Sequence, residues 1–285
     1  KPLVTTFHTV FADPPLPYRP IQEKIAAASD AIIVMNRQAI PYLVKAFGLP
    51  EGKIVYIPHG APGPSCESRE SLRRRLGFSG RKVMFTFGLL SRGKGIESVL
   101  AALPGVIRRV PDTLYVIAGQ THPEVKKREG EAYRDELKAL IHRLGLDGHV
   151  RMEDRYFSEE ELIDYLTACD LYVTPYPGMQ QITSGTLAYA VGVGRPVVST
   201  PYEHARDLLQ GCEELLLPYG DTTAWEERLG QLLADEAALK RWEEKVRQIG
   251  ANTHWPRVGE QHVALFARMC DAKRGEVKTI GTVSH

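Results

Sequence analysis

The chain has 285 residues, of which 43% are hydrophobic and 25% charged, a composition that excludes a disordered or fibrous protein. Lys plus Arg number 36 and Asp plus Glu 35, so the formal net charge of +1 provides no global field for a nucleic acid partner. The apolar runs fall short of the roughly 18 residues that a membrane-spanning helix needs.

The N-terminal segment lacks the basic, apolar and cleavage regions of a signal peptide. The four cysteines lie far apart in the sequence, without CxxC or zinc-knuckle spacing; they are Cys66, Cys169, Cys212 and Cys270. We therefore expect four separate thiols and a reducing, cytoplasmic location.

Apolar runs rich in β-forming residues alternate with helical patterns, which predicts βαβ units and a doubly wound parallel sheet. Ser158 with Glu161 predicts a capping box, and Asp221 predicts another helix N-cap. Pro104 predicts a break or kink in the helix after Lys94. The expected strands are LVTTF (3–7), AIIVM (31–35), KIVYI (53–57), KVMFTF (82–87), TLYVIA (113–118), HVRM (149–152), DLYVTPY (170–176), PVVST (196–200) and ELLLP (214–218).

The segment APGPSCESRES (61–71) is rich in Pro, Ser and Gly and is predicted to be a linker. Three expected strands precede it, too few to form a stable two-faced sheet, whereas six follow it. We expect the remnant of one α/β domain over 1–62 and a complete doubly wound domain over 63–253. The last part, 254–285, is expected to hold an amphipathic helix (256–272) and a frayed tail.

Ligands bind to open α/β sheets at the carboxyl ends of the strands. In FGLLSRGKGIE (87–97), Gly88 ends a strand, and Arg92 and Lys94 precede a helix. Glycines, helix N–H groups and two cations together favour a phosphate site. The alternative is a glycine-rich turn with solvated charges, and the GxxxxGK[ST] spacing of a P-loop is absent.

In PYPGMQQITSGTLAYAVGVGRPVVST (175–200), a helix of small residues is expected to begin near Ser184. Ser184, Gly185 and Thr186 would place hydroxyl and free N–H groups at the positive end of that helix. The alternative is a serine N-cap on a closely packed helix that binds no ligand.

Two further strand ends give weaker signals. AGQTHPEV (118–125) places Gly119 and Gln120 after a strand, although the pattern taken alone favours a surface loop. His8 directly follows the first expected strand, so it is either an ordinary core or surface histidine or a catalytic-loop residue that faces a cleft.

Taken in order, these elements resemble the retaining glycosyltransferases of family four, which have the GT-B fold, over roughly 3–272. The resemblance rests on the strand and histidine of LVTTFHTV, on IPHG (57–60) before the linker, and on Lys94 in a G-R-L-x-x-x-K-G-like loop. It also rests on a strand that ends in AG, a G-x-PV strand, and HWPRVGEQHVALFARM (254–269). It implies one complete Rossmann-like donor-binding domain plus the remnant of a second, acceptor-side domain.

The resemblance also implies roles for individual residues. Lys94 matches the family lysine that grips the donor diphosphate, whereas Leu89 occupies the arginine position. Arg92 is therefore expected to supply the second cation. The helix-start residues that contact the diphosphate correspond to Ser184, Gly185 and Thr186, and Gly88, Gly119 and Gln120 are expected to complete the donor site.

The E-x7-E positions of the family are Gln181 and Tyr189, so neither carboxylate is present. In the family these glutamates meet the donor sugar and the ribose. Gln181 retains a hydrogen-bond donor and an acceptor for a sugar hydroxyl, whereas Tyr189 is a poorer partner for the ribose. Tyr156 lies in the segment that matches base recognition, where an exposed charged turn is the alternative.

The leading hypothesis is a retaining glycosyltransferase that uses a nucleoside-diphosphate sugar, with His8, Arg92 and Lys94 as catalytic residues. Cations aimed at the leaving diphosphate stabilise the transition state. Because no DxD motif is present, we expect no metal and no other cofactor. The sequence does not indicate whether the donor carries UDP, GDP or ADP, nor which acceptor is used.

The alternative hypothesis is a catalytically inactive nucleotide-sugar binding module, or one subunit of a split transferase. Gln181, Tyr189 and the apparent lack of a complete N-terminal half favour it. An isomerase would need cleft carboxylates that these loops lack. The triplet Arg73-Arg74-Arg75 is expected to be a solvated helix face, with peripheral contact to an anionic membrane as a second interpretation.

Overall fold

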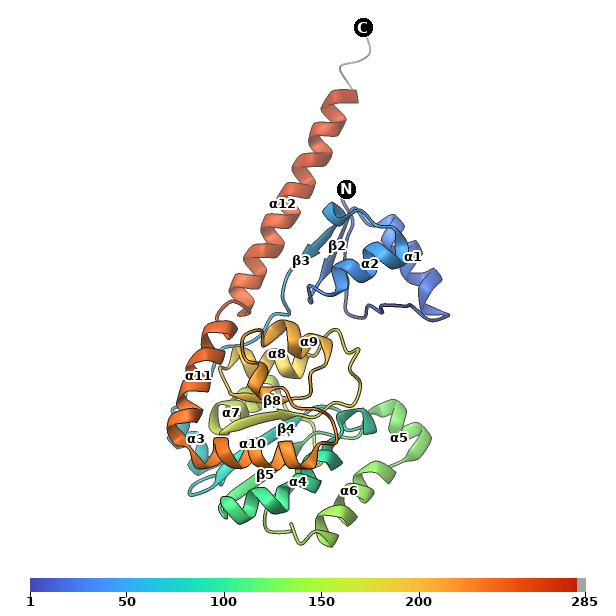
Figure 1. The fold of residues 1–285 in the computed structure, drawn as a ribbon. Coiled ribbons are helices and arrows are strands. Elements are labelled where there is room, and N and C mark those ends of the chain that lie inside the picture. The colour runs from blue at the N-terminus through green and yellow to red at the C-terminus, as the bar shows by residue number, and fades with distance from the viewer. Residues whose placement is uncertain (281–285) are drawn as a thin grey trace.

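The computed structural model describes the backbone of residues 1–280 and the side chains of residues 1–272. It contains two parallel sheets, a smaller one in the order β1-β2-β3 and a larger one in the order β6-β5-β4-β7-β8 (Figure 1). This architecture confirms the predicted α/β, GT-B-like fold. The strands are β1 Val4–Phe7, β2 Ala31–Val34, β3 Ile54–Tyr56, β4 Lys82–Phe87, β5 Thr113–Ala118, β6 Val150–Glu153, β7 Leu171–Thr174 and β8 Val197–Ser199.

Helices cover both faces of the larger sheet, and its core is the main apolar cluster of the molecule. The helices are α1 Tyr18–Ala28, α2 Ala39–Phe47, α3 Arg69–Arg75, α4 Ile96–Arg109, α5 Pro123–Glu129, α6 Ala132–Arg143, α7 Glu159–Ala168, α8 Gly185–Gly192, α9 Glu203–Leu208, α10 Thr222–Ala234, α11 Glu236–Gly250 and α12 Trp255–Ile280. The capping box of Ser158 with Glu161 and the N-cap at Asp221 are both confirmed.

Eight of the expected strands form, but ELLLP (214–218) does not. Residues Glu213–Leu215 make a short 3-10 turn, in which the N–H groups of Leu215 and Leu216 donate to carbonyls three residues earlier. These local bonds consume the backbone donors that a strand would need. Only an isolated bridge to Ser199 remains, closed by the N–H of Leu217 at 2.7 Å.

Helix α4 continues through Pro104, so the prediction that it breaks there is wrong. Proline removes one backbone hydrogen bond from a helix interior. Here the apolar face on both sides of Pro104, including Leu100, Leu103 and Val106, is completely buried. Burial of that face holds the helix together across the missing bond.

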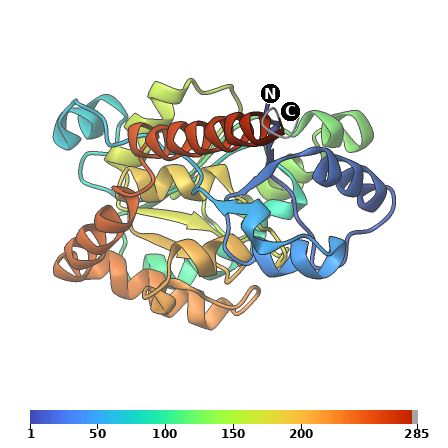
Figure 2. The same ribbon diagram turned by 90° about the horizontal axis from the view of Figure 1, so that it is seen from above.

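Helix α12 is longer than expected, because it begins at Trp255 and continues to Ile280. The frayed tail predicted from residue 273 is therefore helical as far as 280, and residues 281–285 lie outside the described residues. Figures 1 and 2 show α12 running from the larger unit past the smaller sheet. Val258 and Leu265 of α12 share an apolar cluster with Ile33 and Ile57, so this helix ties the two units together.

The loop before α8 also joins the units. Ile182 belongs to the same apolar cluster as Phe7 and Val10 at the end of the smaller sheet. The two sheets therefore approach each other at their carboxyl ends, where the sequence predicted the binding loops.

The basic triplet in α3 is not simply a solvated face. Arg73 donates to Asp170, which is 8% exposed, and to the carbonyl oxygen of Ala168. Arg75 pairs with Asp164 at 2.7 Å, and Arg74 pairs with Glu70 within the helix. The bonds of Arg73 and Arg75 fix α3 to the larger domain, and contact of the triplet with a membrane stays a prediction.

The four cysteines are free thiols, as predicted; Cys169 and Cys212 are buried, whereas Cys66 and Cys270 are exposed. Across the described residues, no helix combines the length and apolar character that crossing a membrane requires.

Candidate functional site

Two loops meet at Gly88, directly after β4. A Cβ atom at this position would lie 3.1 Å from Lys94 Nζ and 3.3 Å from Thr186 Cγ2, and Gly88 has a φ of +127°. Both the left-handed backbone and the short distances favour glycine here. The structure thus brings together Gly88, Lys94 and Thr186, as the sequence predicted, although they lie up to about 100 residues apart.

The start of α8 faces the same point. The Ser184 side chain caps the helix by accepting the N–H of Leu187 at 3.3 Å. The N–H groups at the first positions of a helix have no partner within that helix, so those of Gly185 and Thr186 are available to an anion. The predicted helix start is confirmed, while its role in binding stays a prediction.

His204 of α9 supports the start of α8 through a hydrogen bond. Its Nδ1 accepts the backbone N–H of Ser184 at 2.8 Å. Burial, with the nearby His59 as a second cause, lowers the pKa of His204 to about 3. The ring is therefore neutral at physiological pH, and its Nδ1 lone pair is free to accept this bond.

Sequence reasoning missed a buried hydroxyl beneath the site. Lys94 Nζ donates to the hydroxyl of Tyr176 at 2.8 Å, and that hydroxyl lies 2.9 Å from Thr186 Oγ1. In the sequence, Tyr176 is only the last residue of an expected strand. Neither spacing nor periodicity could indicate that its side chain points back between the two loops.

His8 and Gln181 both line a cavity of about 520 Å³ between the two units. His8 follows β1, and Gln181 lies in the loop before α8, where its Nε2 donates to the carbonyl oxygen of Thr183. Gly93 from the Lys94 loop lines the same cavity. His8 therefore lines this cavity together with Gly93 of the Lys94 loop, while its catalytic role stays a prediction.

A smaller cavity of about 190 Å³ continues behind His8. It is lined in part by His59, Trp255 and His262. Burial lowers the pKa of His59, and the carbonyl of Gly60, which lies 2.7 Å from His59 Nδ1, acts against that shift. His59 therefore adds a polar but uncharged wall to this side of the cleft.

On the other side of Gly88 lies a mainly apolar pocket of about 200 Å³. Phe87, Leu89, Ala118, Phe157 and Leu162 form its apolar wall. The remaining lining residues, Gly88, Gly119, Gln120, Arg155 and Tyr156, include every residue that the sequence placed in this half of the donor site.

Gly119 shapes this pocket through backbone contact. It has a φ of +130°, and a Cβ atom there would lie 2.2 Å from the carbonyl oxygen of Gly88. The ends of β4 and β5 can therefore touch only if residue 119 lacks a side chain. Tyr156 is 79% exposed at the rim, where its aromatic face is free to stack on a flat ligand.

Arg92 does not stand beside Lys94 as a free cation. Its guanidinium forms two hydrogen bonds with the Glu136 carboxylate, at 2.6 and 2.7 Å, and its Nε lies 3.5 Å from Glu129. The hydrogen bonds to Glu136 raise the pKa of Arg92 further. Arg92 is thus paired with two carboxylates, and its expected role as the second cation of the donor site stays a prediction.

Tyr189 is bonded to a neighbouring helix. Its hydroxyl donates to Glu159 Oε1 at the start of α7, at 2.8 Å. Burial and this carboxylate raise the pKa of Tyr189 to about 12. The position lacks its own carboxylate, but the fold brings the carboxylate of Glu159 to it. No pattern in the sequence indicates this pairing.

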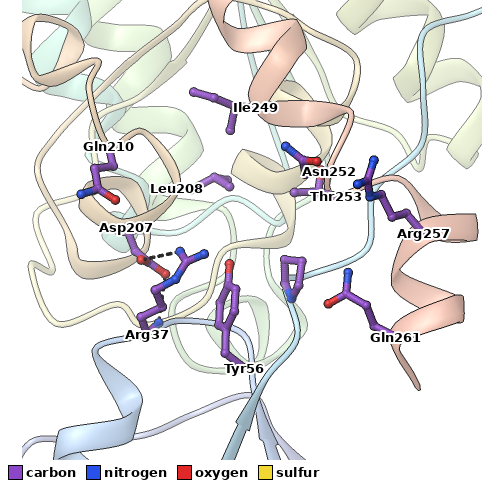
Figure 3. A pocket seen from close by; sticks show the side chains of 11 residues that line it. Arg37, Tyr56, Asp207, Leu208, Gln210, Ile249, Asn252, Thr253, Arg257 and Gln261 are labelled. Atoms are coloured by element: carbon purple, nitrogen blue, oxygen red, sulfur yellow. Dashed lines mark hydrogen bonds and ion pairs between the residues drawn. The ribbon is translucent and has the colours of Figure 1, made fainter. Parts of the chain in front are cut away.

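A fourth cavity, of about 450 Å³, lies at the junction of the smaller sheet, α9 and α12 (Figure 3). Arg37 crosses it to Asp207 at 3.1 Å and stacks over the ring of Tyr56. Tyr42 also donates to Glu203 of α9. The predicted site residues do not line this cavity, whose ion pair serves to join the two units.

Among the residues that the structure describes, no group of three or more His, Cys, Asp or Glu side chains is placed to hold a metal ion.

Several known proteins are similar to this chain. D-inositol 3-phosphate glycosyltransferase from Xylanimonas cellulosilytica is 27% identical over 94% of this chain and 66% of its own length. A GDP-mannose-dependent α-(1-6)-phosphatidylinositol monomannoside mannosyltransferase from Mycolicibacterium smegmatis is also 27% identical, over 74% of this chain and 55% of its own length. The chain thus spans less than two thirds of the length of these relatives.

Two solved structures share the fold at low sequence identity. HepE from Anabaena, in complex with UDP and glucose, has a TM-score of 0.77 at 19% identity, covering 94% of this chain and 72% of its own. Sucrose-phosphate synthase from Thermosynechococcus elongatus has a TM-score of 0.78 at 20% identity, covering 94% and 68%. The family model for glycosyl transferases group 1 matches residues 81–235, more than half of the chain. The chain therefore belongs to the glycosyl transferases group 1 family.

Proposed function

We propose that this chain binds a nucleoside-diphosphate sugar and transfers the sugar to an acceptor. The observation that carries the proposal is the meeting of Lys94 and the α8 N-terminus at Gly88. This positive centre lies next to an apolar pocket suited to a nucleobase and to a second cavity, lined by His8 and Gln181, that could hold a sugar. The family and the UDP complex of the structural neighbour support the same placement.

The geometry suggests how the chain would assist the reaction. As the bond between the sugar and the diphosphate breaks, negative charge grows on the leaving diphosphate. The Lys94 ammonium and the N–H groups of Gly185 and Thr186 stabilise that charge more in the transition state than in the ground state. His8 and Gln181 face the space that the sugar would occupy and can hold its hydroxyls.

We further propose that transfer retains the anomeric configuration and needs no divalent ion. The resemblance to family four supports retention. Metal independence is supported by the positive charge that Lys94 and α8 already place at the diphosphate position. Anomeric configuration of the product, read by proton NMR, tests the first statement, and activity after EDTA treatment tests the second.

The direct test of the donor site is calorimetric titration of the chain with UDP, GDP and ADP, with and without EDTA. We expect one nucleotide to bind, and Lys94→Ala to weaken that binding roughly 10- to 100-fold, the usual cost of losing a charged hydrogen bond. Lys240→Ala is the matched control, because Lys240 is exposed on α11 and pairs only with Glu236. Equal binding by parent and Lys94→Ala would refute the site.

A second candidate is a binding module without catalysis, favoured by Gln181 and by Tyr189 at the positions of the missing carboxylates. The bond from Tyr189 to Glu159 supports the active alternative, since it supplies a carboxylate at one of them. Turnover distinguishes the two: release of nucleotide from UDP-glucose or GDP-mannose in the presence of a broad acceptor mixture indicates an enzyme. Tight donor binding without release indicates the module.

A further inference from the structure

The hydroxyl of Tyr176 bonds to both loops of the proposed diphosphate site. Tyr176 follows β7 and is 1% exposed. Its hydroxyl accepts a hydrogen bond from Lys94 Nζ at 2.8 Å, on the loop after β4. The same hydroxyl lies 2.9 Å from Thr186 Oγ1, in the first turn of α8.

The direction of these hydrogen bonds is fixed by chemistry. An ammonium group can only donate, so the Tyr176 oxygen accepts from Lys94 and has its own proton free for Thr186 Oγ1. Thr186 Oγ1 in turn lies 3.2 Å from Ser184 Oγ, the helix cap. Lys94 donates one of its three ammonium N–H groups to this hydrogen-bond network, and the other two can donate to an anion in the cleft.

The tyrosine ring is well placed to serve as a fixed point. It stacks on the buried ring of Tyr202, with centroids 5.1 Å apart, and the Tyr176 carbonyl accepts a 2.6 Å hydrogen bond from Thr200 Oγ1. Lys94, in contrast, carries its charge on a flexible stem with a large rotamer entropy. Holding that stem before the ligand arrives reduces the ordering cost of binding.

The electrostatic environment of the hydroxyl agrees with this arrangement. Burial opposes ionisation of Tyr176, but the charge and hydrogen bond of Lys94, with smaller help from Thr186, outweigh it and lower its pKa. The Lys94 ammonium and the Tyr176 hydroxyl therefore stabilise each other.

We propose that Tyr176 is a positioning residue, which aims the Lys94 ammonium and the start of α8 at one and the same diphosphate. This inference rests on the proposed function, since it assigns to Tyr176 a task within that donor site. Tyr176 acts through Lys94 and does not itself contact the reacting atoms.

Tyr176→Phe tests the assignment, because phenylalanine keeps the stacked ring and removes only the hydroxyl. Binding is measured by calorimetry with whichever of UDP, GDP and ADP the parent binds. We expect affinity to fall about tenfold, the scale of one charge-assisted hydrogen bond. Tyr115→Phe is the matched control, since it removes another buried hydroxyl, 2.9 Å from Thr86 Oγ1, and should leave affinity unchanged.

A double-mutant cycle separates positioning from a structural effect. If Tyr176 acts through Lys94, Tyr176→Phe weakens binding in the parent but by less than about twofold in the Lys94→Ala background. An equal loss in both backgrounds would assign the effect to structure, and parent-like binding by Tyr176→Phe would also overturn the inference. Thr186→Val serves in the same cycle if Tyr176→Phe does not fold, with the same non-additivity expected.

The two proposals fail in different ways. If the parent binds none of the three nucleotides, the donor site itself is wrong, and the role of Tyr176 falls with it. If the parent binds and Lys94→Ala weakens binding while Tyr176→Phe does not, only the positioning role is wrong.

Discussion

The buried His204 should make the protein lose stability as the pH falls below neutral. In the folded state its pKa is about 3, whereas the unfolded chain has the ordinary value of about 6.5. Between these values the unfolded chain binds one more proton than the folded protein. Stability is therefore complete above about pH 6.5 and decreases as the pH is lowered.

The loss of stability at pH 5 depends mainly on the pKa of His204 in the unfolded chain. Each pH unit below 6.5 costs about 1.4 kcal/mol, so lowering the pH from 7.5 to 5 should cost about 2 kcal/mol through His204 alone. Protonation would also turn Nδ1 from an acceptor into a donor and break its bond from the Ser184 N–H. The start of α8 would then lose the hydrogen bond that supports it, at the same pH at which the protein loses stability.

His204→Asn isolates this contribution, since the Asn side-chain oxygen can accept the Ser184 N–H without titrating. Urea denaturation followed by circular dichroism at pH 7.5 and 5 should show that the parent loses about 2 kcal/mol more than His204→Asn. His142→Asn, at an exposed position, serves as the control and should behave like the parent. An equal pH-dependent loss in the parent and in His204→Asn would refute the reasoning, because His59 and the other titrating groups are common to both.

Two further predictions concern the frame of the site. Asp170 is 8% exposed and accepts hydrogen bonds from two arginines of α3 and from the N–H of Val83. Asp170→Ala should therefore lower the free energy of unfolding, measured by urea denaturation, by about 3 kcal/mol. A loss under about 1 kcal/mol would contradict this prediction. Gly119→Ala should abolish nucleotide binding and cost at least about 2 kcal/mol of stability, because its Cβ would lie 2.2 Å from the Gly88 oxygen at a φ of +130°. Gly148→Ala is the control, because no atom lies within 4 Å of a Cβ at that position. Nucleotide binding is measured by calorimetry and stability by thermal melting. Equal binding and stability of the two variants would show that the ends of β4 and β5 can separate to make room for the methyl group.

Local patterns in the sequence were sufficient for most of the elements. The runs at 82–87 and 113–118 form β4 and β5 with the predicted bounds, because continuous burial on both faces of a parallel strand leaves an unbroken apolar stretch. The Ser158 capping box formed for a similar reason, since its two hydrogen bonds join residues three apart. Patterns failed where two local structures compete, as at 214–218, where hydrogen bonds within the turn took the donors that a strand would have used.

The sequence alone also predicted at which edge of the sheet the proposed site lies. Strand ends with glycines, a lysine and a serine-capped helix must share one edge of a parallel sheet, and this rule predicts that Lys94 and Ser184 lie near each other. The pairing of Arg92 could not be predicted from its charge. Its partner Glu136 is 44 residues away, and only the packing of α6 beside the loop decides that the guanidinium is neutralised.

Only the tertiary structure decided the details on which the chemistry depends. That Tyr176 reaches Lys94, that Glu159 reaches Tyr189 and that His204 holds Ser184 are contacts between elements that meet in space while lying far apart in the chain. Periodicity and caps record interactions within a few residues, whereas such contacts depend on the packing of whole helices and strands. The sequence therefore determined the fold and the sheet edge at which the proposed site lies, and the folded chain determined which side chains meet there.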